Sequence, residues 1–253
     1  MQKIIIVGGG AGGLELVSRL GKTLGKKKQS EIILVDRSRT HVWKPLLHEV
    51  AAGVIDKNSD GVDYSMHAAR HHYQFQLGNL SHINKDKRQI TLDPLLDETG
   101  LELIPERTLD YDYLVLAIGS VSNDFGTPGV AKYSYFLDSL KQAERFHKAL
   151  LNQLIRINQD KNEQHNLRVA IVGGGATGTE LAAQLHHVGN LARAYGMPEM
   201  SAKRLRISII EAGQSILPAL PEKIANSARK ALHKLALKYL KTPWSLKPQK
   251  KDF

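Results

Sequence analysis

Apolar residues recur at two spacings along the chain, one typical of strands and one typical of helices. Short β-branched runs occur in residues 3–13 (KIIIVGGGAGG) and 168–178 (RVAIVGGGATG), and both stop abruptly in glycines. Apolar residues at helical spacing follow each run, namely Leu14, Leu16, Val17 and Leu20 in the first copy and Leu181, Ala182 and Leu185 in the second. A second strand ending in an acid then follows, at residues 31–36 and 206–211. The order strand, glycines, helix, strand, acid therefore occurs twice, which predicts an α/β protein with an internal repeat.

Both strands run into the spacing G-x-G-x-x-G, whose glycines are Gly8, Gly10 and Gly13 in the first copy and Gly173, Gly175 and Gly178 in the second. The first glycine permits a tight turn, the second permits a pyrophosphate to approach, and the third permits close packing of helix on strand. The following helix directs free N–H groups at the phosphates. Asp36 and Glu211 end the second strands, where a carboxylate accepts ribose hydroxyls. The motifs predict two Rossmann-like dinucleotide sites; the alternative is two glycine-rich turns in an ordinary α/β domain.

The segment between the two motifs departs from strict strand and helix alternation. Residues 37–53 form an expected loop rich in large side chains, which covers either the core or a flat ligand. Residues 73–92 alternate in short runs around a polar turn, which predicts an antiparallel meander, and residues 101–110 add a hairpin arm. Residues 113–119 (YLVLAIG) predict a buried strand.

The second half of the chain begins after the turn-rich residues 122–129. Ser139 and Gln142 have the spacing of a capping box, and apolar residues at helical spacing follow them to residue 155. Residues 158–166 form a polar linker, and residues 223–237 again have helical spacing. We expect a first domain over 1–120, a second and incomplete domain over 121–237, and a basic disordered tail over 238–253 that supplies no further strand.

Composition limits the chemistry that the chain can perform. Its 253 residues include 35 Lys and Arg against 25 Asp and Glu, for a net charge of +10, but no cysteine. The positive charge would suit nucleic acid, an anionic membrane surface or anionic cofactors, although most basic residues are scattered as on a solvated surface. The missing cysteines exclude disulfides, thiolate metal sites and thiol redox chemistry. No signal segment is recognisable, no apolar run approaches the roughly 18 residues of a membrane span, and the histidines have no metal-ligand spacing.

Several longer motifs resemble those of the bacterial type II, non-proton-pumping NADH:quinone oxidoreductases, respiratory-chain flavoproteins with two dinucleotides. These motifs are IVGGGAGGLE, WKPLLHEVAAG, LVLAIGS, SNDFGTPGV, IVGGGATGTEL and EAGQSILPALP, and the resemblance extends from residue 3 to about residue 234. The resemblance implies an FAD site at Gly8, Gly9, Gly10, Gly12, Gly13, Asp36, Lys44 and Gly119, with residues 44–47 along the flavin ring. It implies an NADH site at Gly173, Gly175, Thr177, Gly178 and Glu211. One departure is Ile118, where the superfamily usually has threonine.

The activity that the resemblance implies is hydride transfer from NADH to flavin, followed by reduction of a membrane quinone. Glu180 matches a glutamate that the family holds near the nicotinamide and flavin rings. Without the resemblance, Glu180 reads as a solvated helix residue or as a first-turn carboxylate favoured by the helix dipole. The absence of cysteine disfavours disulfide reductases and sulfide:quinone reductases, which need thiols beside the flavin.

Members of this family are substantially longer than this chain. Their C-terminal part completes the FAD domain with a second strand bearing a Gly-Asp pair, and then docks on the cytoplasmic side of the inner membrane. We therefore expect a C-terminally truncated member with impaired activity, and a chain that is itself cytoplasmic. The alternative is a non-catalytic dinucleotide-binding fragment. The resemblance further implies a homodimer and gives no indication of nucleic acid as a partner.

Overall fold

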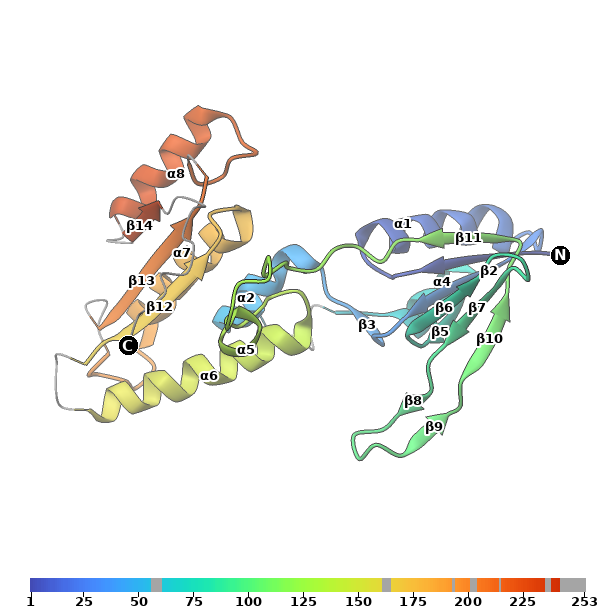
Figure 1. The fold of residues 1–253 in the computed structure, drawn as a ribbon, viewed down its shortest axis with the longest axis horizontal. Coiled ribbons are helices and arrows are strands. Elements are labelled where there is room, and N and C mark those ends of the chain that lie inside the picture. The colour runs from blue at the N-terminus through green and yellow to red at the C-terminus, as the bar shows by residue number, and fades with distance from the viewer. Residues whose placement is uncertain are drawn as a thin grey trace. The chain divides into compact units, whose positions relative to one another are not determined.

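The computed structural model describes residues 1–55, 61–160, 165–192, 194–200, 204–213, 215–234 and 238–241, and these form two compact units. Unit 1 comprises Met1–Lys44 and Lys57–Asn123, and unit 2 comprises Pro45–Asp56 and Asp124–Phe253. Figure 1 shows the elements of both units along the chain. The domain expected over 1–120 thus contains a segment, Pro45–Asp56, that the structure groups with unit 2.

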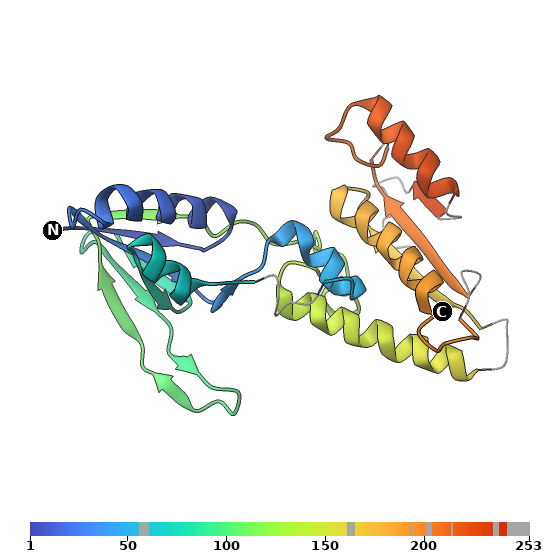
Figure 2. The same ribbon diagram turned by 180° about the vertical axis from the view of Figure 1, so that it is seen from behind.

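The centre of unit 1 is a four-stranded parallel sheet in the order β11-β1-β2-β5. Its strands are β1 (Gln2–Val7), β2 (Ser30–Asp36), β5 (Gln74–Leu77) and β11 (Tyr113–Leu116). Helix α1 (Ala11–Leu20) connects β1 to β2 and continues into a π-helical turn at Gly21–Gly25, while α4 (Tyr64–His71) precedes β5. Figure 2 shows α1 and α4 on the same face of this sheet.

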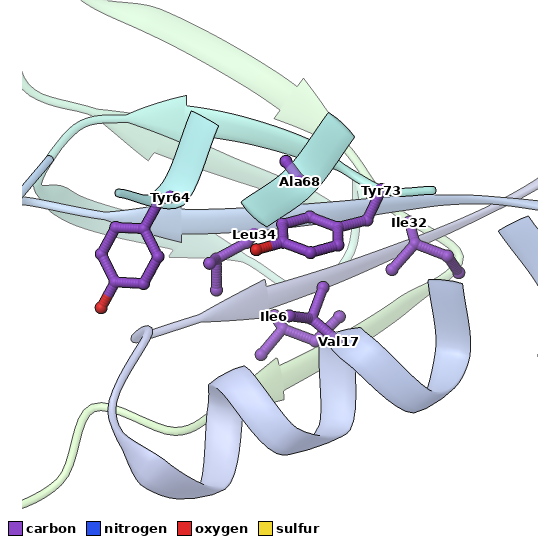
Figure 3. Packing of buried hydrophobic residues seen from close by; sticks show 7 residues of the cluster. All are labelled: Ile6, Val17, Ile32, Leu34, Tyr64, Ala68 and Tyr73. Atoms are coloured by element: carbon purple, nitrogen blue, oxygen red, sulfur yellow. The ribbon is translucent and has the colours of Figure 1, made fainter. Parts of the chain in front are cut away.

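Alternation along β1 and β2 explains why the sheet is covered on both faces, because successive side chains of a strand point to opposite sides. The side chains toward the helices form one buried cluster, shown in Figure 3: Ile6, Val17, Ile32, Leu34, Tyr64, Ala68 and Tyr73. Those on the other face form a second cluster with an antiparallel sheet: Ile5, Val7, Ile33, Val35, Ile90 and Leu92. The central sheet is therefore the middle of three layers.

The antiparallel sheet has the order β10-β7-β6, formed by β6 (Leu80–Asn84), β7 (Gln89–Leu92) and β10 (Arg107–Asp110). An arm of β8 (Leu95–Leu96) and β9 (Glu102–Ile104) projects from it (Figure 1). A short pair, β3 (Thr40–His41) and β4 (Val62–Asp63), completes unit 1. The predicted meander is confirmed for residues 80–92. The predicted hairpin arm is confirmed for β9 only, because β10 pairs with β7 in the antiparallel sheet. For residues 74–77 the prediction was wrong, because β5 pairs parallel with β2 and extends the central sheet.

Strand β11 lies at an edge of the central sheet, and in the part of the chain that the structure describes it pairs with β1 alone. Tyr113 and Leu116 are 55% and 51% exposed. The predicted strand is therefore present, but the prediction that it is buried was wrong. Its apolar composition alone could not distinguish a central strand from an edge strand.

Unit 2 contains a parallel sheet in the order β12-β13-β14 and the helices around it. Its strands are β12 (Leu167–Val172), β13 (Leu205–Glu211) and β14 (Lys238–Lys241), and its helices are α2 (Leu47–Ala52), α5 (Val130–Tyr133), α6 (Leu140–Gln159), α7 (Ala176–Ala192) and α8 (Glu222–Lys234). Helix α2 packs against α6 and α7. The predicted capping box begins α6, with Ser139 Oγ accepting from Gln142 N at 3.4 Å and Gln142 Oε1 accepting from Ser139 N at 3.1 Å.

Two further expectations were wrong. Residues 37–53 are not one loop, since a 3-10 turn at Lys44–Leu46 leads into α2, whose Leu47, Val50 and Ala51 are buried. The expected tail does supply a strand, because β14 pairs parallel with β13. Residues 242–253 lie outside the described residues. Within the described ranges, every helix is too short or too polar to span a bilayer.

Candidate functional site

The two glycine motifs adopt the same backbone geometry. Gly8 and Gly173 have φ angles of +103° and +107°, a left-handed conformation that residues with a Cβ rarely adopt. A Cβ on Gly13 would overlap the carbonyl oxygen of Gly8, and one on Gly178 would overlap that of Gly173. The first glycine of each motif thus permits the turn, and the last permits the helix to approach it. Both predicted roles hold in the structure.

In the first loop the acid that ends β2 holds the backbone of the loop. Asp36 Oδ2 accepts a hydrogen bond from Gly9 N at 2.6 Å, and Asp36 Oδ1 accepts one from Ser38 N at 2.8 Å. On the other side of the same glycine, the buried hydroxyl of Tyr64 donates to Gly9 O at 2.6 Å. His41 Nδ1 lies 3.5 Å from that hydroxyl. Sequence reasoning found Asp36 but missed Tyr64, for which no local pattern gives a signal.

In the second loop a carboxylate again accepts from a glycine N–H, but a different residue donates to the carbonyl of that glycine. Glu211 Oε2 accepts from Gly174 N at 2.6 Å, and Glu211 Oε1 accepts from Gly213 N at 2.7 Å. The carbonyl of Gly174 accepts from Leu217 N at 2.7 Å and lies 3.4 Å from the Thr179 hydroxyl. In both loops, therefore, one carboxylate accepts from the backbone N–H of the residue after the first motif glycine, Gly9 or Gly174, and from that of the residue two positions after the acid itself.

Three glycines of the two loops border open space. Nothing lies within 4 Å of where a Cβ would stand on Gly10, Gly12 or Gly175. Helices α1 and α7 begin directly beside these glycines, so their free N–H groups face this open space. Each carboxylate oxygen can accept more than one hydrogen bond, so Asp36 and Glu211 retain acceptor capacity for ribose hydroxyls.

The remaining residues of the predicted FAD site lie near the first loop in unit 1. The end of β11 borders the loop, because a Cβ on Gly8 would meet the carbonyl of Ala117. Gly119 follows in an open stretch with a φ of +69°, and Lys44 Nζ donates to the carbonyl of Ser120. Lys44 and the segment after β11 thus lie beside each other. In unit 2, Thr177 is exposed at the start of α7.

Glu180 lines a pocket of about 460 Å³ within unit 2, together with Pro45, Leu46, His48, Glu49, Ala183 and Gln184. Its Oε2 lies 3.6 Å from Nδ1 of His48, a buried residue of α2. Sequence reasoning singled out Glu180 but not His48. The helical spacing of Leu47, Val50 and Ala51 was the signal that could have placed His48 on a helix.

A model of the pyridine nucleotide-disulphide oxidoreductase family matches residues 2–242. The chain belongs to this family. The match continues past residue 234, where the resemblance was expected to end, and includes β14. The chain contains no cysteine.

The chain is similar to several named proteins. The chain is 42% identical over 239 residues to a type II NADH:quinone oxidoreductase of Haemophilus influenzae, covering 89% of this chain and 54% of that protein. It is 25% identical over 231 residues to one of Staphylococcus aureus, covering 90% and 53%. The structure of NDH2 from Plasmodium falciparum in complex with NADH matches with a TM-score of 0.81 at 25% identity, over 95% of this chain and 48% of that chain. The chain thus spans about half the length of the curated relatives it matches.

Proposed function

We propose that the chain binds FAD at its first glycine loop and NADH at its second, and that it passes hydride from NADH through the flavin to a quinone. The observation that carries the proposal is the repeated loop, in which a carboxylate and a helix N-terminus flank one open glycine-rich turn. The names of the relatives support NADH and quinone as the substrates. By resemblance to the family, we place the activity at the cytoplasmic surface of the inner membrane and propose a homodimer.

The residues proposed for each cofactor follow the two units. FAD is assigned to the residues around the first loop: Gly8, Gly9, Gly10, Gly12, Gly13, Asp36, Lys44 and Gly119. NADH is assigned to the residues around the second loop: Gly173, Gly175, Thr177, Gly178 and Glu211. Glu180 is assigned as the catalytic carboxylate, because it lies on α7 beyond the second loop and reaches a pocket.

The chain supplies binding and orientation, whereas a bound flavin supplies the hydride chemistry. The N-termini of α1 and α7 stabilise the two pyrophosphates through N–H groups and the helix dipole. Asp36 and Glu211 each orient a ribose, and at the NADH site the Glu211 carboxylate disfavours a 2′-phosphate by charge repulsion, which favours NADH over NADPH. The Glu180 carboxylate provides a hydrogen-bond acceptor for polar N–H groups at the nicotinamide end.

Purified protein incubated with FAD tests the proposal directly. We expect flavin absorbance to remain with the protein after gel filtration, to bleach when NADH is added, and to return when a quinone analogue is added. NADH binding without turnover would favour the alternative of a non-catalytic dinucleotide-binding protein. Failure to bind either dinucleotide would contradict the proposal.

A matched pair of substitutions tests the assignment of the loops. Asp36→Asn is expected to weaken FAD binding about tenfold and Glu211→Gln to weaken NADH binding about tenfold, because each removes a charged acceptor from one site. Each variant serves as the control for the other in separate titrations with FAD and NADH. Weakening of both ligands by either variant would contradict the assignment of one dinucleotide to each loop.

A further inference from the structure

His48 is a buried polar residue whose side chain the proposed function does not use. It is only 6% exposed, and within the described residues its Nδ1 makes no hydrogen bond although that atom is buried. A buried polar atom without a partner costs free energy, so its presence calls for an explanation. Helix α2 fixes the position of the ring, because its apolar residues pack against α6 and α7 and Gly53 ends it in a left-handed conformation.

The ring of His48 lies between two carboxylates. Nδ1 is 3.6 Å from Glu180 Oε2 and Nε2 is 3.8 Å from Glu49 Oε1, distances slightly too long for hydrogen bonds. The side chain of Glu180 is 53% exposed, whereas that of His48 is 7% exposed. Packing therefore encloses the histidine ring, whereas the Glu180 carboxylate reaches solvent and has room for the small rotation that would close the hydrogen bond.

We infer that His48 is a positioning residue that orients the Glu180 carboxylate toward the occupant of the pocket. The inference rests on the proposed function, in which the nicotinamide end of NADH reaches this pocket. An exposed glutamate loses rotamer entropy when it engages a ligand. A donor held in place on α2, His48, selects one rotamer of Glu180 before the ligand arrives. Less rotamer entropy is then lost when NADH binds.

The chemistry of histidine provides a sharp set of variants. The side-chain nitrogen of asparagine can stand close to the position of Nδ1, whereas that of glutamine can stand close to the position of Nε2. His48→Asn thus places an N–H donor toward Glu180, whereas His48→Gln places one toward Glu49 instead. His48→Leu removes both ring nitrogens while keeping a residue that can be buried.

NADH binding to the full chain without flavin, followed by fluorescence, provides the main readout. We expect His48→Leu and His48→Gln to weaken NADH binding about tenfold and His48→Asn to weaken it less than about threefold. In a Glu180→Ala background, His48→Leu is expected to add less than about twofold, because His48 acts through the glutamate. The inference would be overturned if His48→Leu weakened NADH binding equally with Glu180 and with Glu180→Ala, or if no variant weakened it. It would also be overturned if His48→Gln kept the affinity and His48→Asn did not.

A control variant and a ligand-free measurement separate this inference from the proposed function. His147 in α6 also has a buried Nδ1 without a hydrogen bond among the described residues but does not line the pocket, so His147→Asn should leave NADH affinity unchanged. In the ligand-free protein, the ¹³C signal of the Glu180 carboxyl should shift in His48→Leu and not in His48→Asn. If the unsubstituted chain does not bind NADH, the proposed function fails while this signal still decides the role of His48. An unmoved signal in His48→Leu would overturn the inference in either case.

Discussion

Tyr64 shows how one residue far away in the sequence fixes the first glycine loop. Its hydroxyl donates to Gly9 O, while Asp36 accepts from Gly9 N, so the peptide groups on both sides of the glycine are held. Burial, and then the charge of Asp36, raise the pKa of Tyr64 well above its ordinary value, so the hydroxyl stays protonated and remains a donor. A Cβ on Gly9 would overlap the tyrosine ring, which ties the two residues together sterically as well.

Replacing the tyrosine tests this contact. Tyr64→Phe is expected to lower the free energy of unfolding by about 1 kcal/mol, because a buried carbonyl loses its donor. It should also weaken FAD binding, because the loop is less well held. Urea unfolding and a flavin titration measure the two effects. Tyr73→Phe is the control, since its hydroxyl contacts His67 and not the loop, and a similar loss of FAD affinity in that variant would contradict the prediction.

His67 gives the fold a pH dependence whose direction can be worked out. Burial lowers the pKa of His67 below 6.5, with further contributions from the nearby charges of His71, Lys22, Arg70 and His41. The rings of His67 and His71 are stacked with centroids 4.0 Å apart, an arrangement that two imidazolium ions would disfavour. The unfolded chain therefore binds the proton more tightly than the folded chain does.

The sign of this linkage predicts lower stability in acid. The contribution of His67 to the free energy of unfolding is fully present above pH 6.5. It is lost as the pH falls through the lower pKa that His67 has in the folded state. His67→Gln should therefore reduce the slope of unfolding free energy against pH in this interval, measured by urea unfolding. His82→Gln, at an exposed position, is the comparison. An unchanged slope in His67→Gln would show that other groups cause the acid sensitivity.

At the scale of elements, helix α6 depends on a local signal at its N-terminus. Ser139→Ala removes the side-chain acceptor of the capping box and is expected to lower the free energy of unfolding by about 1 kcal/mol. Ser139→Thr keeps the hydroxyl and should retain most of the stability in the same urea titration. Equal losses in both variants would show that the hydroxyl does not stabilise the helix.

The elements that sequence reasoning placed correctly are those specified by neighbouring residues. The capping box of α6 and the turn of the β6–β7 hairpin are local, so their residues predict them. The errors concern which strands pair with each other in a sheet. Strand β5 could join either the meander or the central sheet, and its contact with β2 decided between them. Strand β14 lacks an apolar pattern, and its pairing with β13 is likewise a long-range contact.

At the scale of the whole molecule, the internal repeat predicts two ligand sites that respond separately. In hydrogen exchange, FAD is expected to protect the amides of residues 8–13 and NADH those of residues 173–178, because each ligand covers one loop. At a concentration of about 100 times its dissociation constant, each ligand should raise the free energy of unfolding by about 2.7 kcal/mol, because only the folded state binds it. Protection of the same loop by both dinucleotides would contradict the assignment.

The sequence by itself determined the α/β class, both glycine loops and the acids Asp36 and Glu211. It could do so because strand, turn, helix and ribose acid follow one another in a fixed local order. Only the tertiary structure brought Tyr64 to Gly9, His48 to Glu180 and Pro45–Asp56 into unit 2. These are contacts between residues far apart in sequence, and they depend on how helices and strands pack. A pattern along one segment does not specify the side chain that packing places opposite it.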